Sequence, residues 1–577
     1  MLRSATRSRV RTLAKHAKPV RASSNRFAST STHQESDVVI VGGGPAGLAL
    51  ATALSSNPLL RNSLKVVLVE AGDLSKVANW TQPAGTYSNR VSSITNASQS
   101  FLQEIGAWAH VEEGRTCPID EMQIWDGISD ARITFSVQDD QALIGTGTDT
   151  PSRMSTMTEN LNLQRALLHH LRGASAVEIA DKVKVQSIQR EEREGGGGWP
   201  LVHLSDGRVL RTRLLVGADG FNSPVRAYAG IQSYGWAYDT TAVVATLLHH
   251  PRTSFQAPNT IAYQRFLPTG PIAFLPLSPT ASSMVWSTKP HLAKALLASD
   301  PAVLTGMINA AFRLPEVSLR YLHDVLLEAA AAGTPLTPHQ LREEISWRER
   351  SHAIDSRSAY SLAADPTGVP PADADLLPPL VTSVQPGSAA SFPLRFSHAD
   401  EYIGDGAGAR TVLVGDAAHT IHPLAGQGLN MGLGDVDALA RCIQQAVLTG
   451  GDIGSRTALL PYARARYFEN HKIMAACDKL HKLYGATAAP LVWARSVGVE
   501  VLNELDAVKA AMMLAAGSRP PRARPSGPQL GADVAAKGLE TLARGVSGVR
   551  GLAEGVANVA GAGLQRLLQG LANSQKR

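Results

Sequence analysis

The stretch Asp37-Val-Val-Ile-Val-Gly42-Gly43-Gly44-Pro45-Ala46-Gly47 decides the fold of this chain. Its β-branched run predicts a buried strand that ends at Gly42, and Pro45 and Ala46 then favour the first turn of a helix. In this G-x-G-x-x-G spacing, Gly42 allows a tight turn, Gly44 lets the backbone approach a pyrophosphate, and Gly47 lets the helix pack closely on the strand. The helix N-terminus carries partial positive charge and free N–H groups, which can hold a phosphate.

A second strand supports this interpretation. The run Leu64-Lys-Val-Val-Leu-Val-Glu70 predicts another buried strand, so the two strands and the intervening helix begin a parallel sheet. Glu70 ends the second strand, where a carboxylate can accept hydrogen bonds from ribose hydroxyls. The combination predicts a dinucleotide site, but it does not separate FAD from NAD.

Two further apolar strands end in glycine, and each is followed by an aspartate. The first runs from Leu214 to Gly217 and continues as Ala218-Asp219-Gly220, and the second runs from Thr411 to Gly415 and continues as Asp416. Each also has a simpler explanation: the first is a common strand-end turn, and Asp416 is a possible helix N-cap.

The sequence does not predict a metal site or a disulfide scaffold. His419 and His422 follow the third glycine motif, and a structural polar role is the simplest interpretation, because no cysteine or third histidine stands nearby to complete a zinc site. Cys117, Cys442 and Cys477 are far apart, which excludes a cysteine-rich framework and suits a reducing compartment.

The net charge of +6 comes from the N-terminus. Residues 1–34 hold eight Lys and Arg and no acid, so 47 of the 55 basic residues remain against 49 acidic ones. This near-equal number of basic and acidic residues does not indicate nucleic-acid binding. The Arg-rich, Ser-rich, acid-free composition predicts a mitochondrial transit peptide, with a disordered basic arm as the alternative. The chain is 44% hydrophobic, which excludes a disordered class, and it has no uncharged apolar run long enough to span a membrane.

Taken together, the three glycine motifs resemble the signature of the FAD-dependent aromatic hydroxylases, the group of para-hydroxybenzoate hydroxylase. The resemblance covers roughly residues 36–480, and the motifs occur in the family's order and spacing. Four shorter segments resemble the ubiquinone-biosynthesis hydroxylases within this group: residues 88–95, residues 101–108, residues 158–165 and Gly404-Asp405.

The resemblance implies an α/β fold. It consists of a Rossmann-like FAD-binding domain, an interleaved β-sheet substrate domain and C-terminal helices. The expected boundaries are 1–34 for the transit peptide, 35–230 with 396–458 for the FAD-binding domain, 231–395 for a β-rich substrate domain with a Pro-rich insertion near 362–388, 459–516 for the C-terminal helices, 517–530 for a linker and 531–577 for an amphipathic tail.

The resemblance also implies the roles of the cofactor residues. Asp416 would bind the ribitol or ribose of FAD, Asp219 would face the pyrophosphate, and Arg90 would lie over the flavin. Pro423 would lead into a helix whose N-terminal N–H groups, from Gly426 to Leu429, stabilise negative charge on the reduced flavin. The expected cofactor set is Gly42, Gly44, Pro45, Ala46, Gly47, Glu70, Arg90, Asn160, Asp219, Gly415, Asp416, Gly426, Gly428, Leu429 and Asn430. Gln427 belongs to the same helix start, and no catalytic base is identified.

The implied reaction is hydroxylation of the benzene ring of a polyprenylated phenol by dioxygen, through a flavin hydroperoxide. The protein must hold the ring and keep water away. Four aromatic residues of the middle region either line a ring pocket and tail channel or form ordinary core: Phe255, Phe266, Phe274 and Trp286.

The expected partners follow from a substrate that stays in the bilayer. They are a membrane surface, other ubiquinone-biosynthesis proteins, and a ferredoxin with its reductase as electron source, on the matrix side of the mitochondrial inner membrane. The segment 531–571 combines an apolar stripe with basic residues and is expected either to dock on the membrane or to be a packing helix or tail.

Three alternatives remain. A flavin halogenase or prenyl reductase of the same fold is disfavoured because no Trp-x-Trp pair occurs. An NAD-dependent dehydrogenase leaves the motifs at Gly217 and Gly415 unexplained. A flavin-loaded structural subunit of the biosynthetic complex is the non-enzymatic alternative.

Overall fold

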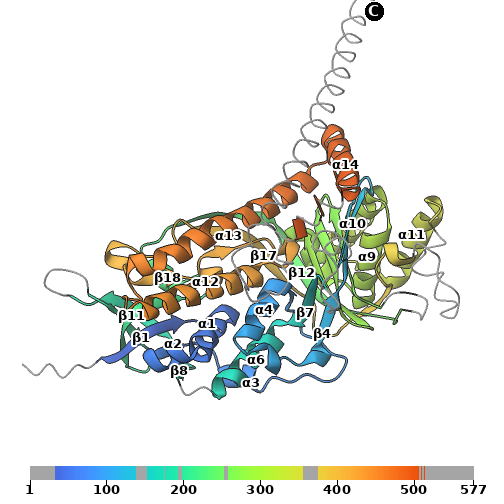
Figure 1. The fold of residues 1–577 in the computed structure, drawn as a ribbon. Coiled ribbons are helices and arrows are strands. Elements are labelled where there is room, and N and C mark those ends of the chain that lie inside the picture. Colours follow the sequence, from blue (N-terminus) through green and yellow to red (C-terminus); the bar gives the residue numbers. More distant parts are fainter. Residues whose placement is uncertain are drawn as a thin grey trace, which may run out of the picture.

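The computed structural model describes residues 33–137, 153–173, 176–192, 198–252, 256, 258–354, 374–505, 508–509 and 512–513. Two large sheets lie at opposite ends of the molecule, with a small sheet between them (Figure 1). Residues 1–32 of the predicted transit peptide, residues 362–373 of the Pro-rich insertion, and the predicted linker and tail lie outside the described residues.

The first sheet contains the motif that opened the sequence argument. Its strands lie in the order β8-β2-β1-β11-β10-β9. Strand β10 pairs with the first residues of β11, and β18 pairs with its last residues, 215–217. The pairs β8–β2, β2–β1, β1–β11 and β11–β18 are parallel, so the four predicted glycine- and acid-ended strands are neighbours. The bounds are β1 Gln34–Val41, β2 Val66–Val69, β8 Val177–Ala180, β9 Val185–Arg190, β10 Pro200–Leu204, β11 Val209–Gly217 and β18 Thr411–Leu413.

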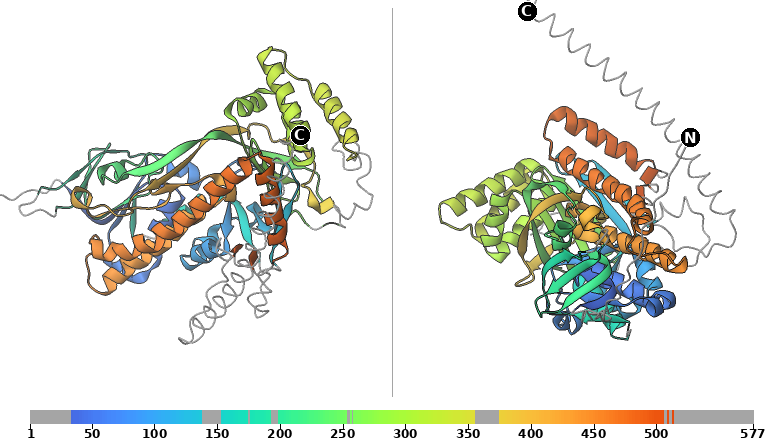
Figure 2. Two further views of the ribbon diagram at one scale, coloured as in Figure 1. Left: turned by 90° about the horizontal axis from the view of Figure 1, so that it is seen from above. Right: turned by 90° about the vertical axis from the view of Figure 1, so that its left-hand side faces the viewer.

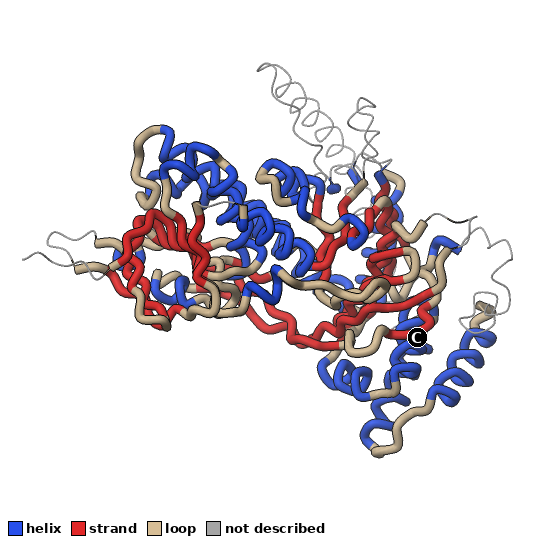
Figure 3. Tube along the Cα trace, turned by 90° about the horizontal axis from the view of Figure 1, so that it is seen from below, coloured by secondary structure: helices blue, strands red, loops and turns tan. Residues whose placement is uncertain are grey.

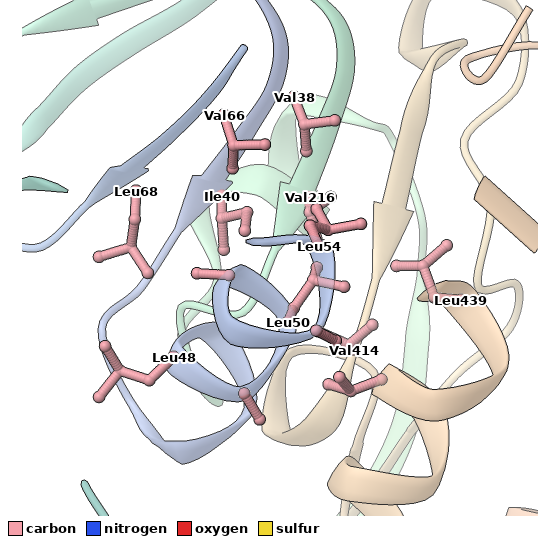
Figure 4. Packing of buried hydrophobic residues seen from close by; sticks show 14 of the residues in the cluster. Val38, Ile40, Leu48, Leu50, Leu54, Val66, Leu68, Val216, Val414 and Leu439 are labelled. Carbon is pink, nitrogen blue, oxygen red and sulfur yellow. The ribbon is translucent and has the colours of Figure 1, made fainter. Parts of the chain in front are cut away.

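Three long helices pack with this sheet. Helix α1 (Pro45–Ser56) contacts both α6 (Asn160–Arg172) and α12 (Gly428–Leu448). Leucines and valines from the sheet and these helices form one core, part of which is shown in Figure 4. Residues 47–55 of α1 are all buried, which its small and apolar sequence permits. Shorter helices in this half are α2 Pro58–Ser63, α3 Leu74–Ala78, α4 Asn96–Glu104 and α7 Pro224–Tyr228.

The small sheet, in the order β3-β7-β4, lies between the two large ones. Its strands are β3 Val91–Thr95, β4 Thr116–Ile119 and β7 Ser155–Glu159, and all pairs are antiparallel. Helices α4 and α6 leave directly from β3 and β7, so this sheet joins the first core to the second half.

The second sheet has nine strands in the order β19-β17-β12-β15-β14-β13-β5-β6, with β16 beside β12. Strand β13 pairs in parallel with β5, so residues 121–136 belong here and not to the cofactor-binding domain to which the sequence boundaries assigned them. The bounds are β5 Glu121–Asp126, β6 Arg132–Ser136, β12 Ser233–His249, β13 Ile261–Leu267, β14 Gly270–Ser278, β15 Ala281–Thr288, β16 Val381–Val384, β17 Ala390–Ala399 and β19 His419–Thr420.

Four helices pack beside this sheet (Figure 3). They are α8 Pro290–Ala298, α9 Pro301–Arg313, α10 Glu316–Ala331 and α11 Pro338–Ser351. These helices were not predicted, since a β-rich region was expected here, although proline at the first turn of α8, α9 and α11 is a helix-start signal. Phe274 and Trp286 are fully buried among these helices, so the core interpretation is confirmed for both residues. Phe255 lies outside the described residues.

Two final helices complete the fold. Helix α13 (Arg456–Gly485) runs along the molecule from the first sheet toward the second, and α14 (Ala489–Asn503) lies across its end (Figure 2). Both lie in the predicted C-terminal helical region. Among the described residues, no helix combines the length and the apolar composition that crossing a membrane requires.

Candidate cofactor site

The turn after β1 leaves open space in front of α1. Gly42 has φ +111°, and a Cβ there would lie 2.2 Å from the Ala218 carbonyl oxygen, so the turn requires glycine. A Cβ at Gly47 would lie 1.9 Å from the Gly42 oxygen, which explains how closely the helix packs. Gly44, by contrast, has no atom within 4 Å of where its Cβ would be. No side chain caps α1, so its first N–H groups face this space.

Glu70 lies beside the same turn. Its Oε2 accepts a hydrogen bond from Gly43 N at 2.5 Å, and its Oε1 accepts one from Gly72 N at 2.6 Å. The carboxylate is therefore fixed at the carboxyl end of β2, next to α1. Its predicted contact with a ribose stays a prediction.

The second motif brings a carboxylate with a free oxygen to this edge. Asp219 follows β11, and its Oδ2 accepts a hydrogen bond from Val225 N at 3.1 Å. Its Oδ1 is buried and has no hydrogen-bond partner among the described residues. Burial raises the pKa of Asp219 above its usual value, although hydrogen bonds from Ser223 and Val225 oppose the shift. A buried oxygen without a donor is costly, so this atom fits a ligand that supplies one.

The third motif packs directly on the first. A Cβ at Gly415 would lie 3.3 Å from the Ala46 Cβ, so the turn η7 (Gly415–Ala417) lies against the start of α1. Asp416 has no hydrogen-bond or ion-pair partner among the described residues. The surrounding protein raises its pKa above the usual value, against the opposing charge of His419, yet solvent still reaches the side chain. Asp416 is therefore an acid that is unpaired within the described ranges and accessible to solvent beside the start of α1.

A buried network of hydrogen bonds around Asp435 holds η7 in place. Asp435 Oδ2 accepts hydrogen bonds from Gly415 N at 3.1 Å and His419 Nε2 at 2.6 Å, and its Oδ1 accepts from Arg466 Nε and Asn470 Nδ2, both at 2.9 Å. Burial alone would raise the pKa of Asp435, but these partners lower it to about 2. The structural role predicted for His419 is confirmed. Within the described part of the chain, no cluster is arranged to hold a metal ion.

The start of α12 points into the same region. The turn η8 (Pro423–Ala425) precedes it, Gly426 is left-handed at φ +59°, and no side chain caps the helix. Asn430 Nδ2 donates to Ser93 O at 2.7 Å, and its Oδ1 accepts from Thr95 N at 3.0 Å. Asn430 therefore anchors the helix start to β3, and the groups that could contact a cofactor are the backbone N–H groups.

The small sheet places Arg90 and Asn160 together. Asn160 N donates to Arg90 O at 3.0 Å, and Asn160 Oδ1 accepts from Ser92 Oγ at 2.7 Å. The Arg90 side chain is exposed, and its guanidinium has no partner in the described ranges. Because β3 also carries Ser93 and Thr95, Arg90 and the start of α12 are held by the same strand.

Two buried groups near these elements, Glu159 and His422, were not among the predicted site residues. Glu159 is fully buried; it accepts from Arg115 Nε at 2.6 Å and from Ser88 N at 2.5 Å. The signal that could have identified Glu159 is its place at the end of a Ser- and Thr-rich strand, directly before a helix. His422 was noted only as a structural residue; it is buried, neither ring nitrogen has a partner among the described residues, and burial lowers its pKa to about 3.

Comparisons with known proteins agree with this geometry. Residues 35–295 and 381–472 match the family model described as an FAD binding domain. The protein called Ubiquinone biosynthesis monooxygenase COQ6, mitochondrial, is 40% identical in Xenopus tropicalis over 85% of this chain and 95% of the relative. Its counterpart in Saccharomyces cerevisiae is 37% identical over 84% and 94%, and that in Homo sapiens is 35% identical over 87% and 96%.

This chain belongs to the ubiquinone biosynthesis monooxygenase family. The family fold also occurs in distant solved structures. The p-nitrophenol 4-monooxygenase PnpA from Pseudomonas putida has a TM-score of 0.54 at 16% identity and covers 84% of this chain and 100% of its own. A variant of P. aeruginosa PqsL has a TM-score of 0.52 at 21% identity and covers 78% and 97%.

The residues of this ubiquinone biosynthesis monooxygenase fit FAD. The open space at Gly44 and the uncapped start of α1 suit a pyrophosphate. The orphaned oxygen of Asp219 and the unpartnered Asp416 suit hydroxyl donors. The uncapped start of α12 supplies a second set of N–H groups to the same edge.

Proposed function

We propose that this chain uses FAD and dioxygen to hydroxylate the benzene ring of a polyprenylated phenol in ubiquinone biosynthesis. The observation that carries the proposal is the meeting of three separate glycine motifs at one edge of the first sheet, in a member of a monooxygenase family. When bound, FAD supplies the transfer of one oxygen atom from dioxygen to the ring.

The proposed work of the first two motifs is to bind the cofactor. The N–H groups at the start of α1 hold the pyrophosphate, because they lack partners and lie at the positive end of the helix. Glu70 accepts hydrogen bonds from the adenosine ribose hydroxyls. Asp219 accepts a hydrogen bond from a hydroxyl group of the cofactor near its pyrophosphate. Asp416, on the neighbouring turn, accepts from ribitol hydroxyls, with Asp435 fixing the backbone beneath it at 3.1 Å.

The proposed work of α12 is electrostatic. The N–H groups of residues 427–429 stabilise negative charge on the reduced cofactor ring, as a helix N-terminus does for other anions. Arg90 approaches the same ring from β3. Since Asn430 joins α12 to β3 through two hydrogen bonds, the two groups keep a fixed separation.

Apolar side chains next to η8 would keep water from the reacting atoms. Leu424 of η8, together with Met122 and Met154, packs against a cluster that contains Phe266 and Tyr484. We infer that the phenol ring binds on this side of η8, because an apolar wall excludes water and receives an aromatic ring. Phe266, although buried, then borders the ring site through this cluster, whereas Phe274 and Trp286 belong to the separate core of the second sheet.

The finer biological setting is inferred from the substrate class and the N-terminal composition. We infer import into the mitochondrial matrix, peripheral attachment to the inner membrane, and assembly with other ubiquinone-biosynthesis proteins. We also infer reduction by a ferredoxin with its reductase.

One experiment tests cofactor, donor and reaction together. The purified protein is reduced without oxygen, either by NADPH or by ferredoxin with its reductase and NADPH, and then mixed with oxygen and a prenylated phenol. The proposal expects a yellow protein, reduction by the ferredoxin system, and a product with one added oxygen atom. A folded protein that binds no flavin, or a reduced protein that forms only hydrogen peroxide, would contradict it.

A further inference from the structure

The turn between α13 and α14 exposes a group of apolar side chains. We define the α13–α14 corner as residues 479–494. Its exposed apolar side chains are Trp493 (61% exposed), Leu491 (49%), Leu480 (40%) and Leu483 (40%). In residues 489–494 every side chain except Val492 is exposed, so the start of α14 projects into solvent (Figure 1). Single exposed leucines are ordinary, but three exposed leucines and an exposed tryptophan around one turn between two helices indicate an interaction surface.

The charge of the corner is positive. No Asp or Glu occurs from residue 479 to residue 499. Lys479 is exposed and has no partner among the described residues, and Lys482 Nζ lies 2.7 Å from Asp478 Oδ2. Asp478 offsets the charge of Lys482 through this ion pair, and Glu500 lies at the far end of α14, so Lys479 carries the uncompensated positive charge of residues 479–494.

Arg495 holds the corner in this shape. Its Nη1 donates to the carbonyl oxygens of Leu483 at 2.8 Å and Ala486 at 2.7 Å, which are the last carbonyls of α13 and its turn. Its Nε lies 2.5 Å from Asp126 Oδ2, so the turn is fixed to the second sheet. The exposed apolar side chains therefore lie on a turn whose backbone is held in place by Arg495.

The inner side of the corner leads to the cofactor site. Tyr484 stacks on Phe266, with ring centroids 4.0 Å apart and 21° between the planes. Both belong to the apolar cluster against which Leu424 of η8 packs. Apolar contacts therefore connect the exposed corner with the turn that precedes α12.

We propose that the α13–α14 corner docks this protein on an anionic phospholipid bilayer. Trp493 and Leu491 enter the interface, and Lys479 faces the lipid phosphates. Tryptophan favours the level of the headgroups, and each nearby lysine strengthens binding to an anionic leaflet. The inference rests on the proposed function, because a polyprenyl tail stays in the bilayer and must be met at its surface.

The test is co-sedimentation of the full chain with vesicles. One set contains phosphatidylcholine alone, and the other contains phosphatidylcholine with phosphatidylglycerol. We expect the wild type to bind the anionic set, and Trp493→Ser with Leu491→Ser to weaken that binding by about ten-fold. Lys479→Gln is expected to weaken it by about five-fold on anionic vesicles and to leave any residual binding to neutral vesicles unchanged.

The matched control is Trp347→Ser, which removes a tryptophan of similar exposure (58%) from α11. The control is expected to bind as the wild type does. The proposal is overturned if the wild type does not bind, if the double variant binds normally, or if the control loses binding equally. It is also overturned if the corner variants instead convert a dimer into a monomer, since a second copy is then the occupant.

Hydroxylation of a short-chain, water-soluble prenyl phenol in the absence of lipid separates this proposal from the proposed function. The corner variants are expected to turn over this substrate at the wild-type rate. If the wild type fails to hydroxylate it but still binds vesicles through the corner, the proposed function fails and the docking surface stands.

Discussion

The guanidinium of Arg495 and the carboxylate of Asp126 form a bidentate ion pair across 369 positions of the chain. The Nε–Oδ2 distance is 2.5 Å and the Nη2–Oδ1 distance is 3.0 Å. Both side chains are almost fully buried. The pair joins α14 to β5, and thereby fixes the C-terminal helices to the second sheet.

Asp126→Ala should destabilise the protein strongly, because it leaves the Arg495 charge buried without its partner. We expect a loss of about 3–5 kcal/mol in the free energy of unfolding, measured by urea denaturation of the flavin-loaded protein. Glu469→Ala breaks the exposed pair with Lys472 (2.8 Å) and should cost at most about 1 kcal/mol. Equal effects of the two substitutions would refute the anchoring role of Asp126.

Gly44→Ala should separate folding from cofactor binding. A Cβ at Gly44 meets no protein atom within 4 Å, and the residue has φ −71°, so the apoprotein should fold with normal stability. The methyl group would occupy space assigned to the pyrophosphate, so FAD affinity should fall at least about ten-fold, read by flavin fluorescence titration. In Gly47→Ala, a Cβ 1.9 Å from the Gly42 oxygen should instead lower stability itself. Normal FAD affinity in the Gly44 variant would place the pyrophosphate elsewhere.

Arg90→Ala should weaken FAD binding or slow its reduction without changing apoprotein stability. The side chain is exposed and makes no contact that the described fold needs. Stopped-flow reduction and thermal denaturation measure the two properties separately. A variant with unchanged reduction and unchanged FAD affinity would exclude Arg90 from the site.

Asp435 should make the protein acid-labile in a defined range. Its pKa falls from 3.8 to about 2 on folding, so its ionised form contributes stability that is fully present above pH of about 4. About 2 kcal/mol of this contribution should be lost as the pH falls from about 4 to 2. The difference in unfolding free energy between the wild type and Asp435→Asn should therefore shrink on acidification. A pH-independent difference would show that Asp435 has an ordinary pKa in the folded protein.

The sequence was sufficient for the parts of the fold that are local. The strand before Gly42, the helix after it and the strand before Glu70 follow from periodicity and glycine chemistry, and they lie as expected. The neighbouring positions of Asp219 and Asp416 were also predictable, because parallel strands align their carboxyl ends at one edge.

Long-range pairing could not be predicted in the same way. The alternation of apolar residues in residues 121–126 predicts a strand but not that it pairs with residues 261–266 of another region. Nothing near Asp126 or Arg495 in the sequence indicates that the two residues pair, because they are 369 positions apart. Asn430 was assigned to the cofactor, yet its side chain joins α12 to β3.

The chain order of the first sheet has a consequence for biosynthesis. Its closing strand, β18 at Thr411–Leu413, is made long after β1 at Gln34–Val41, and the whole second sheet apart from the short β19 is made in between. A nascent or prematurely terminated polypeptide that is shorter than this point lacks both β18 and the turn that carries Asp416. On the proposed role of Asp416, flavin loading is expected only after residue 416 of 577 has been synthesised, and neither sheet is encoded by one continuous segment of the gene.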